Sequence, residues 1–189
     1  MMWDEKELTK KEIDMLFNEL NSELKEKRIT LSVVVYGGSA FALYELRNST
    51  TDIDVEIKKG EINIDTQKII EKMAKKHSLR GDWLNESVSV LLSDNIKNSK
   101  KIEYMNLSNL IIQIPPKDQL LAMKIIAGRL KDKEDVKKLL LEMGIFNKSD
   151  IVSIVEVYFG LEYKRINLEE NNRLSRFINE VLGEIKNET

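Results

Sequence analysis

Residues 33–57 carry the pattern that most constrains the fold: VVVYGGSAFALYELRNSTTDIDVEI. Val33 to Tyr36 are β-branched or aromatic, which is typical of a buried strand. Gly37-Gly38 then predicts a turn, and the apolar positions that follow predict a short helix capped by Ser39. From Asp52 to Ile57 acidic and apolar residues alternate, which predicts a second strand with its carboxylates on one face.

This order of elements also predicts chemistry. Asp52 and Asp54 lie two positions apart on a strand, so their side chains share a face with Cα atoms roughly 6–7 Å apart. Like charges this close repel, and a cation between them relieves the repulsion. Oxygen ligands favour Mg²⁺ or Mn²⁺ over zinc. The turn Gly37-Gly38-Ser39 offers backbone N–H groups for a phosphate, so the stretch predicts a site for a metal-complexed nucleoside triphosphate.

Gly37-Gly38-Ser39 followed by Thr51-Asp52-Ile53-Asp54 resembles the signature of the DNA polymerase β-like nucleotidyltransferase superfamily. A glycine pair followed by an arginine, a threonine and Asp-Ile-Asp-Val resembles the bacterial antibiotic nucleotidyltransferases and the AbiEii- and MenT-type toxins. The superfamily often supplies a third carboxylate from a neighbouring strand. Glu86 and Glu103 are the candidates here, and neither lies in a recognisable motif.

A second constellation lies in the segment from Leu121 to Asp135. Lys124 interrupts an apolar stretch, where an ammonium group needs a partner or must extend to solvent. The AbiEii- and MenT-type enzymes carry a lysine in a helix after the sheet, followed by an Arg-x-x-Asp-x-x-Asp run. Lys124, Arg129, Asp132 and Asp135 match that pattern. The resemblance implies that Lys124 and Arg129 bind the nucleotide and that an aspartate assists catalysis. Helix capping by the aspartates and an Arg129–Asp132 surface salt bridge are equally compatible with the sequence.

Composition excludes several other classes of site. The 189 residues include no cysteine and a single histidine, His77, so a thiolate site and a zinc site built from several histidines are excluded. The formal net charge is −2, which gives no overall attraction to nucleic acid. The charged N-terminus and the lack of a long apolar run predict a cytoplasmic protein without a membrane segment.

The remaining segments predict an α+β fold: a small mixed sheet flanked by helices and followed by a C-terminal helical bundle. Pro115-Pro116 ends the sheet, which predicts a nucleotidyltransferase-like core over 1–115 and a helical subdomain over 116–189. Strands are expected at 88–92, 102–105 and 110–114. Helices are expected at 9–27 (with a Thr9–Glu12 capping box), 65–77 (capped by Asp65), 118–130, 132–144 (capped by Asp132), from Asn147 or Ser149 to 160, and 168–186.

The sequence therefore predicts a metal-dependent enzyme that transfers a nucleoside monophosphate from an NTP to a hydroxyl group and releases pyrophosphate. The acceptor is left open among a tRNA or other RNA end, a protein and a small molecule. The resemblance adds a toxin role with a cognate antitoxin as partner. Two alternatives are a catalytically inactive nucleotide- or partner-binding module of the same fold, and an interaction protein whose aspartate pair is merely solvated. Oligomeric state is left open.

Overall fold

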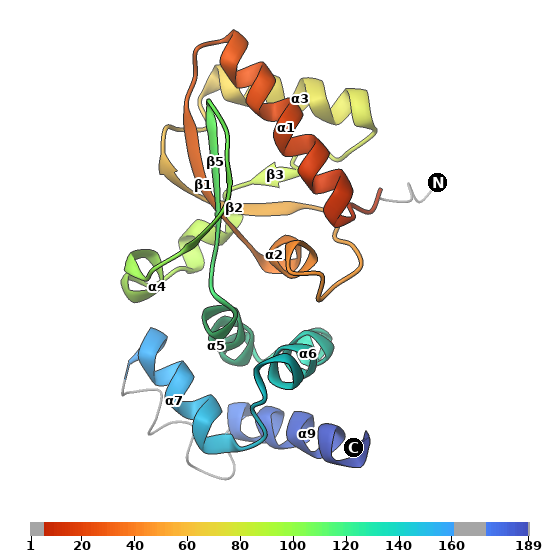
Figure 1. The fold of residues 1–189 in the computed structure, drawn as a ribbon, viewed down its shortest axis with the longest axis vertical. Coiled ribbons are helices and arrows are strands. Elements are labelled where there is room, and N and C mark those ends of the chain that lie inside the picture. Colours follow the sequence, from red (N-terminus) through yellow and green to blue (C-terminus); the bar gives the residue numbers. More distant parts are fainter. Residues whose placement is uncertain (1–5, 161–172, 189) are drawn as a thin grey trace. The chain divides into compact units, whose positions relative to one another are not determined.

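The fold was analysed in a computed structural model of the chain, which describes residues 6–160 and 173–188. The chain divides into two compact units (Figure 1). The N-terminal unit comprises Met1–Leu92 and Lys101–Pro115, and the C-terminal unit comprises Ser93–Lys100 and Pro116–Thr189. The α+β class predicted from the sequence, with a mixed sheet flanked by helices and followed by further helices, is confirmed.

The N-terminal unit is built on a five-stranded sheet in the order β3-β2-β1-β5-β4. β1 pairs antiparallel with β2 and parallel with β5, so the sheet is mixed. β2 pairs parallel with β3, and β5 pairs antiparallel with β4. The strands are β1 (Leu31–Tyr36), β2 (Ile53–Lys59), β3 (Leu84–Asn85), β4 (Ile102–Asn106) and β5 (Leu110–Ile114).

Three helices complete this unit: α1 (Lys10–Glu26), α2 (Gly37–Leu43) and α3 (Ile64–His77). α1 contacts both α3 and β5, and it begins with the predicted capping box, in which the Thr9 side chain and Glu12 bond reciprocally. α3 is capped by Asn63, whose side chain accepts two backbone N–H bonds, so the prediction of an Asp65 cap is wrong by two positions.

The segment after β3 differs from its prediction. Residues 88–92 were expected to form a strand, but Ser87–Leu91 form the 3₁₀ helix η1. The Asn85 side chain accepts the backbone N–H of Ser87 at 2.9 Å, and this local turn winds the chain away from the sheet after two paired residues. At this position the turn formed by Asn85 therefore outweighs the strand preference of the β-branched residues.

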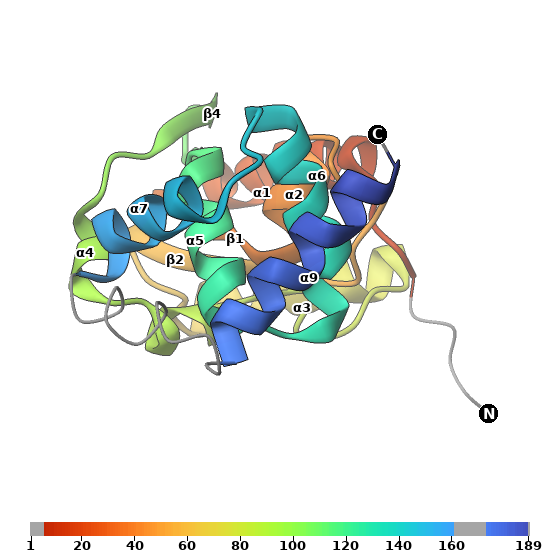
Figure 2. The ribbon, with the colours of Figure 1, turned by 90° about the horizontal axis from the view of Figure 1, so that it is seen from below.

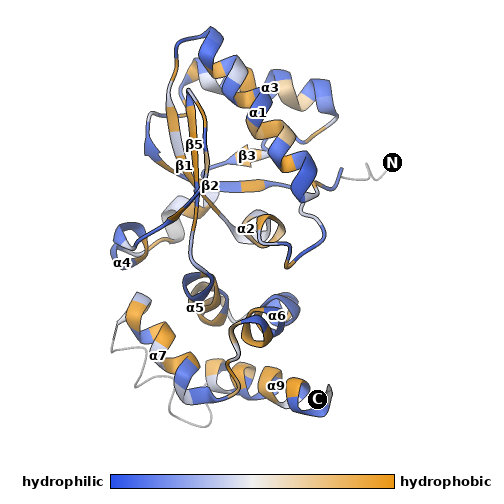
Figure 3. Cartoon of the chain, in the orientation of Figure 1, coloured by the Kyte–Doolittle hydropathy of each residue, from blue (hydrophilic) through white to orange (hydrophobic). Residues whose placement is uncertain are grey.

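The C-terminal unit is helical in its described part. Its interior is lined by the apolar faces of α5, α6, α7 and α9, and α9 contacts the other three (Figure 2). Hydrophobic and hydrophilic residues alternate around α9 at helical spacing (Figure 3). Its apolar face is buried and consists of Leu174, Phe177, Ile178, Val181, Leu182 and Ile185. The elements are α4 (Asp94–Asn98), α5 (Lys117–Ala127), the 3₁₀ helix η2 (Leu130–Asp132), α6 (Lys133–Met143), α7 (Lys148–Phe159) and α9 (Arg173–Glu188).

Two features of this unit depart from prediction. Ser93 caps α4, a short helix that was not expected. α5 ends at Ala127 because Gly128 adopts a left-handed conformation as its C-cap. The start predicted for the last helix, Leu168, lies outside the described residues. In the described part of the chain this helix is α9, which begins at Arg173. No helix in the described ranges combines the length and apolarity that crossing a bilayer requires.

Candidate nucleotide site

The glycine turn joins β1 directly to α2. Gly37 has φ 62°, a conformation that glycine adopts without strain, and it is the first residue of α2. Ser39 was predicted to cap this helix, but Tyr36 occupies the N-cap position without a side-chain bond. Ser39 lies inside the helix, 1% exposed, with its hydroxyl donating to the Tyr36 carbonyl at 2.7 Å. What Ser39 can offer a ligand is therefore its backbone N–H.

Asp54 meets this turn from the adjacent strand. Tyr36 and Asp54 are paired residues of β1 and β2, and a Cβ added at Gly37 would lie 2.7 Å from Asp54 Oδ2. The other carboxylate oxygen, Oδ1, accepts the Ser87 hydroxyl at 3.0 Å. Asp52 immediately precedes β2, so strand alternation places it on the same face as Asp54, and both residues are partly exposed. The structure thus brings the predicted glycine turn and the second aspartate into contact.

Arg47 and Thr50 approach the second glycine of the turn. A Cβ at Gly38 would lie 2.8 Å from Arg47 Nη1 and 2.8 Å from Thr50 Oγ1. A guanidinium group beside the turn makes it a better receptor for an anion than backbone N–H groups alone. Sequence reasoning noted the arginine in the motif without assigning it a position in the site. The indication in the sequence was the position of Arg47 in the polar loop between the glycine turn and the two aspartates.

A polar cluster continues along β2 beyond the aspartates. The buried Glu56 carboxylate accepts the Tyr36 hydroxyl at 3.0 Å and the Lys58 ammonium at 2.8 Å. Burial and the positive charge of Lys58 lower the pKa of Lys101 to about 8, against the opposing effect of Glu56. The face of β2 that carries the aspartates therefore also carries cations. None of these four residues was assigned to the site from the sequence.

The second predicted constellation assembles within the C-terminal unit. Lys124 Nζ lies 2.5 Å from Asp132 Oδ1 and 2.8 Å from Asp135 Oδ2, and all three side chains are at most 9% exposed. Arg129 Nε lies 2.6 Å from Asp132 Oδ2, with its side chain 54% exposed. The four residues matched by resemblance thus form one ionic cluster. Asp132 occupies the N-cap position of α6 but makes no capping bond, because its two oxygens face Lys124 and Arg129.

The charge state of Asp132 follows from these contacts. Burial would raise the pKa of its carboxyl, but hydrogen bonds from Lys124 and Arg129 outweigh burial and lower that pKa below the ordinary 3.8. Asp132 is therefore ionised at neutral pH. The cluster is a buried, charge-assisted network rather than a surface salt bridge.

The Asp52–Asp54 pair suits a hard divalent cation. Mg²⁺ is commonly held by one or two carboxylates, several waters and the phosphates of a substrate. Within residues 6–160 and 173–188 there is no group of three or more acidic or histidine side chains arranged for a metal ion. A two-carboxylate site completed by a nucleotide fits this donor set, and Glu86 and Glu103 are not part of a larger acidic group in the described chain.

Comparison with protein families gives a match over most of the chain. Residues 11–186 match the family described as "Nucleotidyltransferase of unknown function (DUF6036)". The chain belongs to this family. The match includes both the β1–α2–β2 motif and the Lys124 cluster, and it supports general nucleotidyltransferase function without specifying the reaction. No curated protein and no solved structure gave a significant match.

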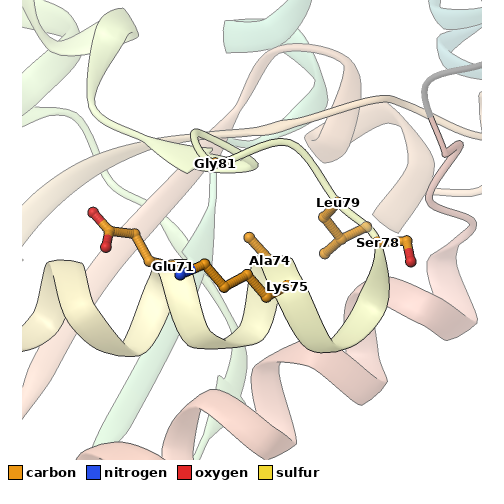
Figure 4. A pocket seen from close by; sticks show the side chains of 6 residues that line it. All are labelled: Glu71, Ala74, Lys75, Ser78, Leu79 and Gly81. Carbon is orange, nitrogen blue, oxygen red and sulfur yellow. The ribbon is translucent and has the colours of Figure 1, made fainter. Parts of the chain in front are cut away.

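A hollow elsewhere in this nucleotidyltransferase does not contain the aspartate pair or the glycine turn of the candidate site. It has a volume of about 440 Å³ and lies between α3 and the loop that follows it (Figure 4). Its charged groups, Glu71 and Lys75, belong to one helix, and Ala74 and Leu79 supply apolar surface. Trp83, which follows this loop in the chain, is fully buried and donates its Nε1–H to the Ile70 carbonyl. Trp83 therefore presents no ring face to a substrate.

The contact between Gly37 and Asp54 gives a first prediction. Gly37→Ala should destabilise the protein by about 1–2 kcal/mol, because an alanine is strained at positive φ. Its methyl group would also overlap Asp54 Oδ2 and displace the carboxylate. Gly81→Ala is the matched control, since a Cβ there meets nothing within 4 Å. Equal melting temperatures for the two variants would contradict the close approach.

Proposed function

We propose that this nucleotidyltransferase transfers a nucleoside monophosphate from an NTP to a hydroxyl acceptor and releases pyrophosphate. The observation that carries the proposal is the contact of the Asp54 carboxylate with the Gly37-Gly38 turn, beside Arg47. A carboxylate pair for a divalent cation and a phosphate receptor are adjacent there, as a metal-complexed triphosphate requires.

Each group has a distinct role in the proposal. Asp52 and Asp54 would hold Mg²⁺ or Mn²⁺, which when bound supplies electrostatic stabilisation of the charge that develops on the phosphoryl oxygens. Arg47 and the backbone N–H groups of Gly38 and Ser39 orient the phosphates, because the first N–H groups of a helix have no intrahelical acceptor. Ser87 fixes the Asp54 carboxylate through its hydroxyl. Most of the rate acceleration then comes from positioning and preorganised charge.

The Lys124 cluster enters the proposal through the resemblance to AbiEii- and MenT-type enzymes. Lys124 and Arg129 would offset phosphate charge, and Asp132 or Asp135 would assist catalysis. Arg129 is the most exposed member and the best placed to meet a ligand. If the acceptor is an RNA end, the proposal extends to a toxin role, with a cognate antitoxin as partner.

Thermal denaturation with each of the four NTPs, with and without Mg²⁺, tests the site. A ligand that binds only the folded state raises the melting temperature, and at about 100 times its Kd it stabilises by about 2.7 kcal/mol. We expect a rise that needs both NTP and Mg²⁺ and that an Asp52→Ala/Asp54→Ala variant lacks. The same rise in that variant, or none in the folded wild type, would contradict the proposal.

A second function is favoured by one observation, the lack of a third acidic ligand among the described residues. In this reading the protein is a nucleotide- or partner-binding module without catalysis. It predicts the same thermal shift but no pyrophosphate release with any acceptor. Measuring pyrophosphate in the samples used for denaturation therefore separates the two functions.

A further inference from the structure

A positively charged hollow lies in the C-terminal unit where the end of α5 meets the start of α9. Its volume is about 410 Å³, and its lining includes three arginines, Arg129, Arg173 and Arg176. Gly128 permits this approach, because a Cβ there would lie 2.9 Å from Leu174 and 3.3 Å from Arg173 Nη2. The arginines come from segments more than forty residues apart in sequence, so the fold itself brings them together.

The charges around this hollow leave a net positive lining. Arg129 uses its Nε toward Asp132, which leaves the outer edge of its guanidinium group for other acceptors. Arg173 donates one bond, from Nη2 to the Ala127 carbonyl at 3.2 Å. Glu180 is the single carboxylate among the described lining residues, and it lies 2.7 Å from the Lys133 ammonium. The acid that could neutralise the arginines is thus already paired.

Capping of α5 explains part of this arrangement but not all of it. Arg173 binds a terminal carbonyl of α5, as basic residues commonly do at helix ends. Arg176 lines the same hollow, and among the described hydrogen bonds it makes none to the end of α5. Arg129 already has Asp132 as its counter-ion, so it is the convergence of Arg173 and Arg176 beside it that favours a further anion in the hollow.

We propose that this arginine pocket binds a phosphate group, from a free polyphosphate or from a nucleic-acid strand. Guanidinium groups bind phosphate oxygens through paired hydrogen bonds, which matches three arginines around one hollow. Phe177, the aromatic residue among the described lining residues, is 4% exposed and so offers no open face on which a base could stack. The pocket therefore recognises phosphate charge and not base identity, whether or not Asp52 and Asp54 catalyse transfer.

Calorimetric titration of the full chain with inorganic tripolyphosphate, in EDTA, tests the proposal for a free anion. Fluorescence anisotropy with a labelled single-stranded RNA, at several salt concentrations, tests it for a strand. The variant is Arg173→Gln/Arg176→Gln, which leaves Arg129 and its contact with Asp132 in place. The control is Lys138→Gln/Lys186→Gln, which removes two charges from the same unit outside the pocket. An Asp52→Asn/Asp54→Asn variant separates this binding from the proposed nucleotide site.

For a free polyphosphate, we expect the arginine variant to bind tripolyphosphate at least about tenfold more weakly, with the control and the aspartate variant unchanged. For a strand, we expect a weaker salt dependence in the arginine variant. The negative slope of log affinity against log salt should become shallower by about 1.4, because two phosphate contacts are lost. Either result supports the pocket and identifies its ligand source. Absence of binding to both probes, or equal binding by the arginine and control variants, would overturn the proposal.

Discussion

Replacing Asp54 with asparagine is expected to abolish nucleotide transfer while the protein stays folded. Asparagine has nearly the shape of aspartate, and its amide oxygen can still accept the Ser87 hydroxyl that bonds to Oδ1. The negative charge that would hold a divalent cation is lost. Removal of one preorganised electrostatic group typically costs about 10²–10³ in rate, and we expect a loss at least that large.

The stability of the same variant should move in the opposite direction to its activity. Asp52 and Asp54 repel each other when no cation is bound, because they lie two positions apart on one strand face. Neutralising one of them removes that repulsion, so the melting temperature without metal should equal or exceed that of the wild type. A site whose charges cost stability and provide activity is typical of functional residues.

The measurement is pyrophosphate release, together with transfer of label from an NTP radiolabelled at its α-phosphate to RNA, protein or small-molecule acceptors. Asp82→Asn is the matched control, because it removes an exposed carboxylate of the same unit that pairs with Arg80. Asp82→Asn should retain full activity. Transfer at the wild-type level by Asp54→Asn would contradict the assignment of this carboxylate.

Sequence reasoning succeeded where local pattern and long-range packing agree. Alternation along β2 buries Ile53 and Val55, the capping box forms at Thr9, and the apolar stripe of α9 is buried. The strands expected at 102–105 and 110–114 are present as β4 and β5, which pair antiparallel. In these segments a shift by one residue would expose the apolar side chains to solvent, so the pattern is compatible with only one register.

The site was predicted less completely because its geometry depends on contacts between distant residues. The local sequence places Arg47 in the loop between the glycine turn and the aspartates, but it does not show that the guanidinium group lies against Gly38, or that burial lowers the pKa of Lys101. The Lys124 cluster was suggested by resemblance, and spacing alone also allowed helix capping. Only the structure shows that Asp132 bonds to Lys124 and Arg129 instead of the helix end.

The second large effect concerns Lys124. Lys124→Met should destabilise the C-terminal unit by about 3–5 kcal/mol, because it removes the cation that two buried carboxylates contact. For a chain of this length, that loss corresponds to a fall in melting temperature of roughly 10 °C. Lys117→Met is the matched control on the same helix: Lys117 pairs with Glu142 at the surface, and such pairs contribute about 0–1 kcal/mol.

Acid should reduce the difference between wild type and Lys124→Met. The pKa of Asp132 is lowered in the folded wild type, so the contribution of Asp132 to stability is present above its unfolded value of 3.8 and is lost as pH falls below it. Without Lys124, the folded pKa of Asp132 moves upward and less stability remains to be lost. The deficit measured by urea denaturation should therefore be largest near neutral pH and shrink toward pH ~3.

A double variant then separates charge burial from packing. Lys124→Met/Asp135→Leu replaces one ion pair with apolar side chains, and such replacements of buried pairs are often neutral or stabilising. It should recover much of the stability that Lys124→Met loses, because a buried carboxylate no longer lacks its cation. Failure to recover, together with a deficit that does not change with pH, would show that Lys124 acts through packing and not through the ionic cluster.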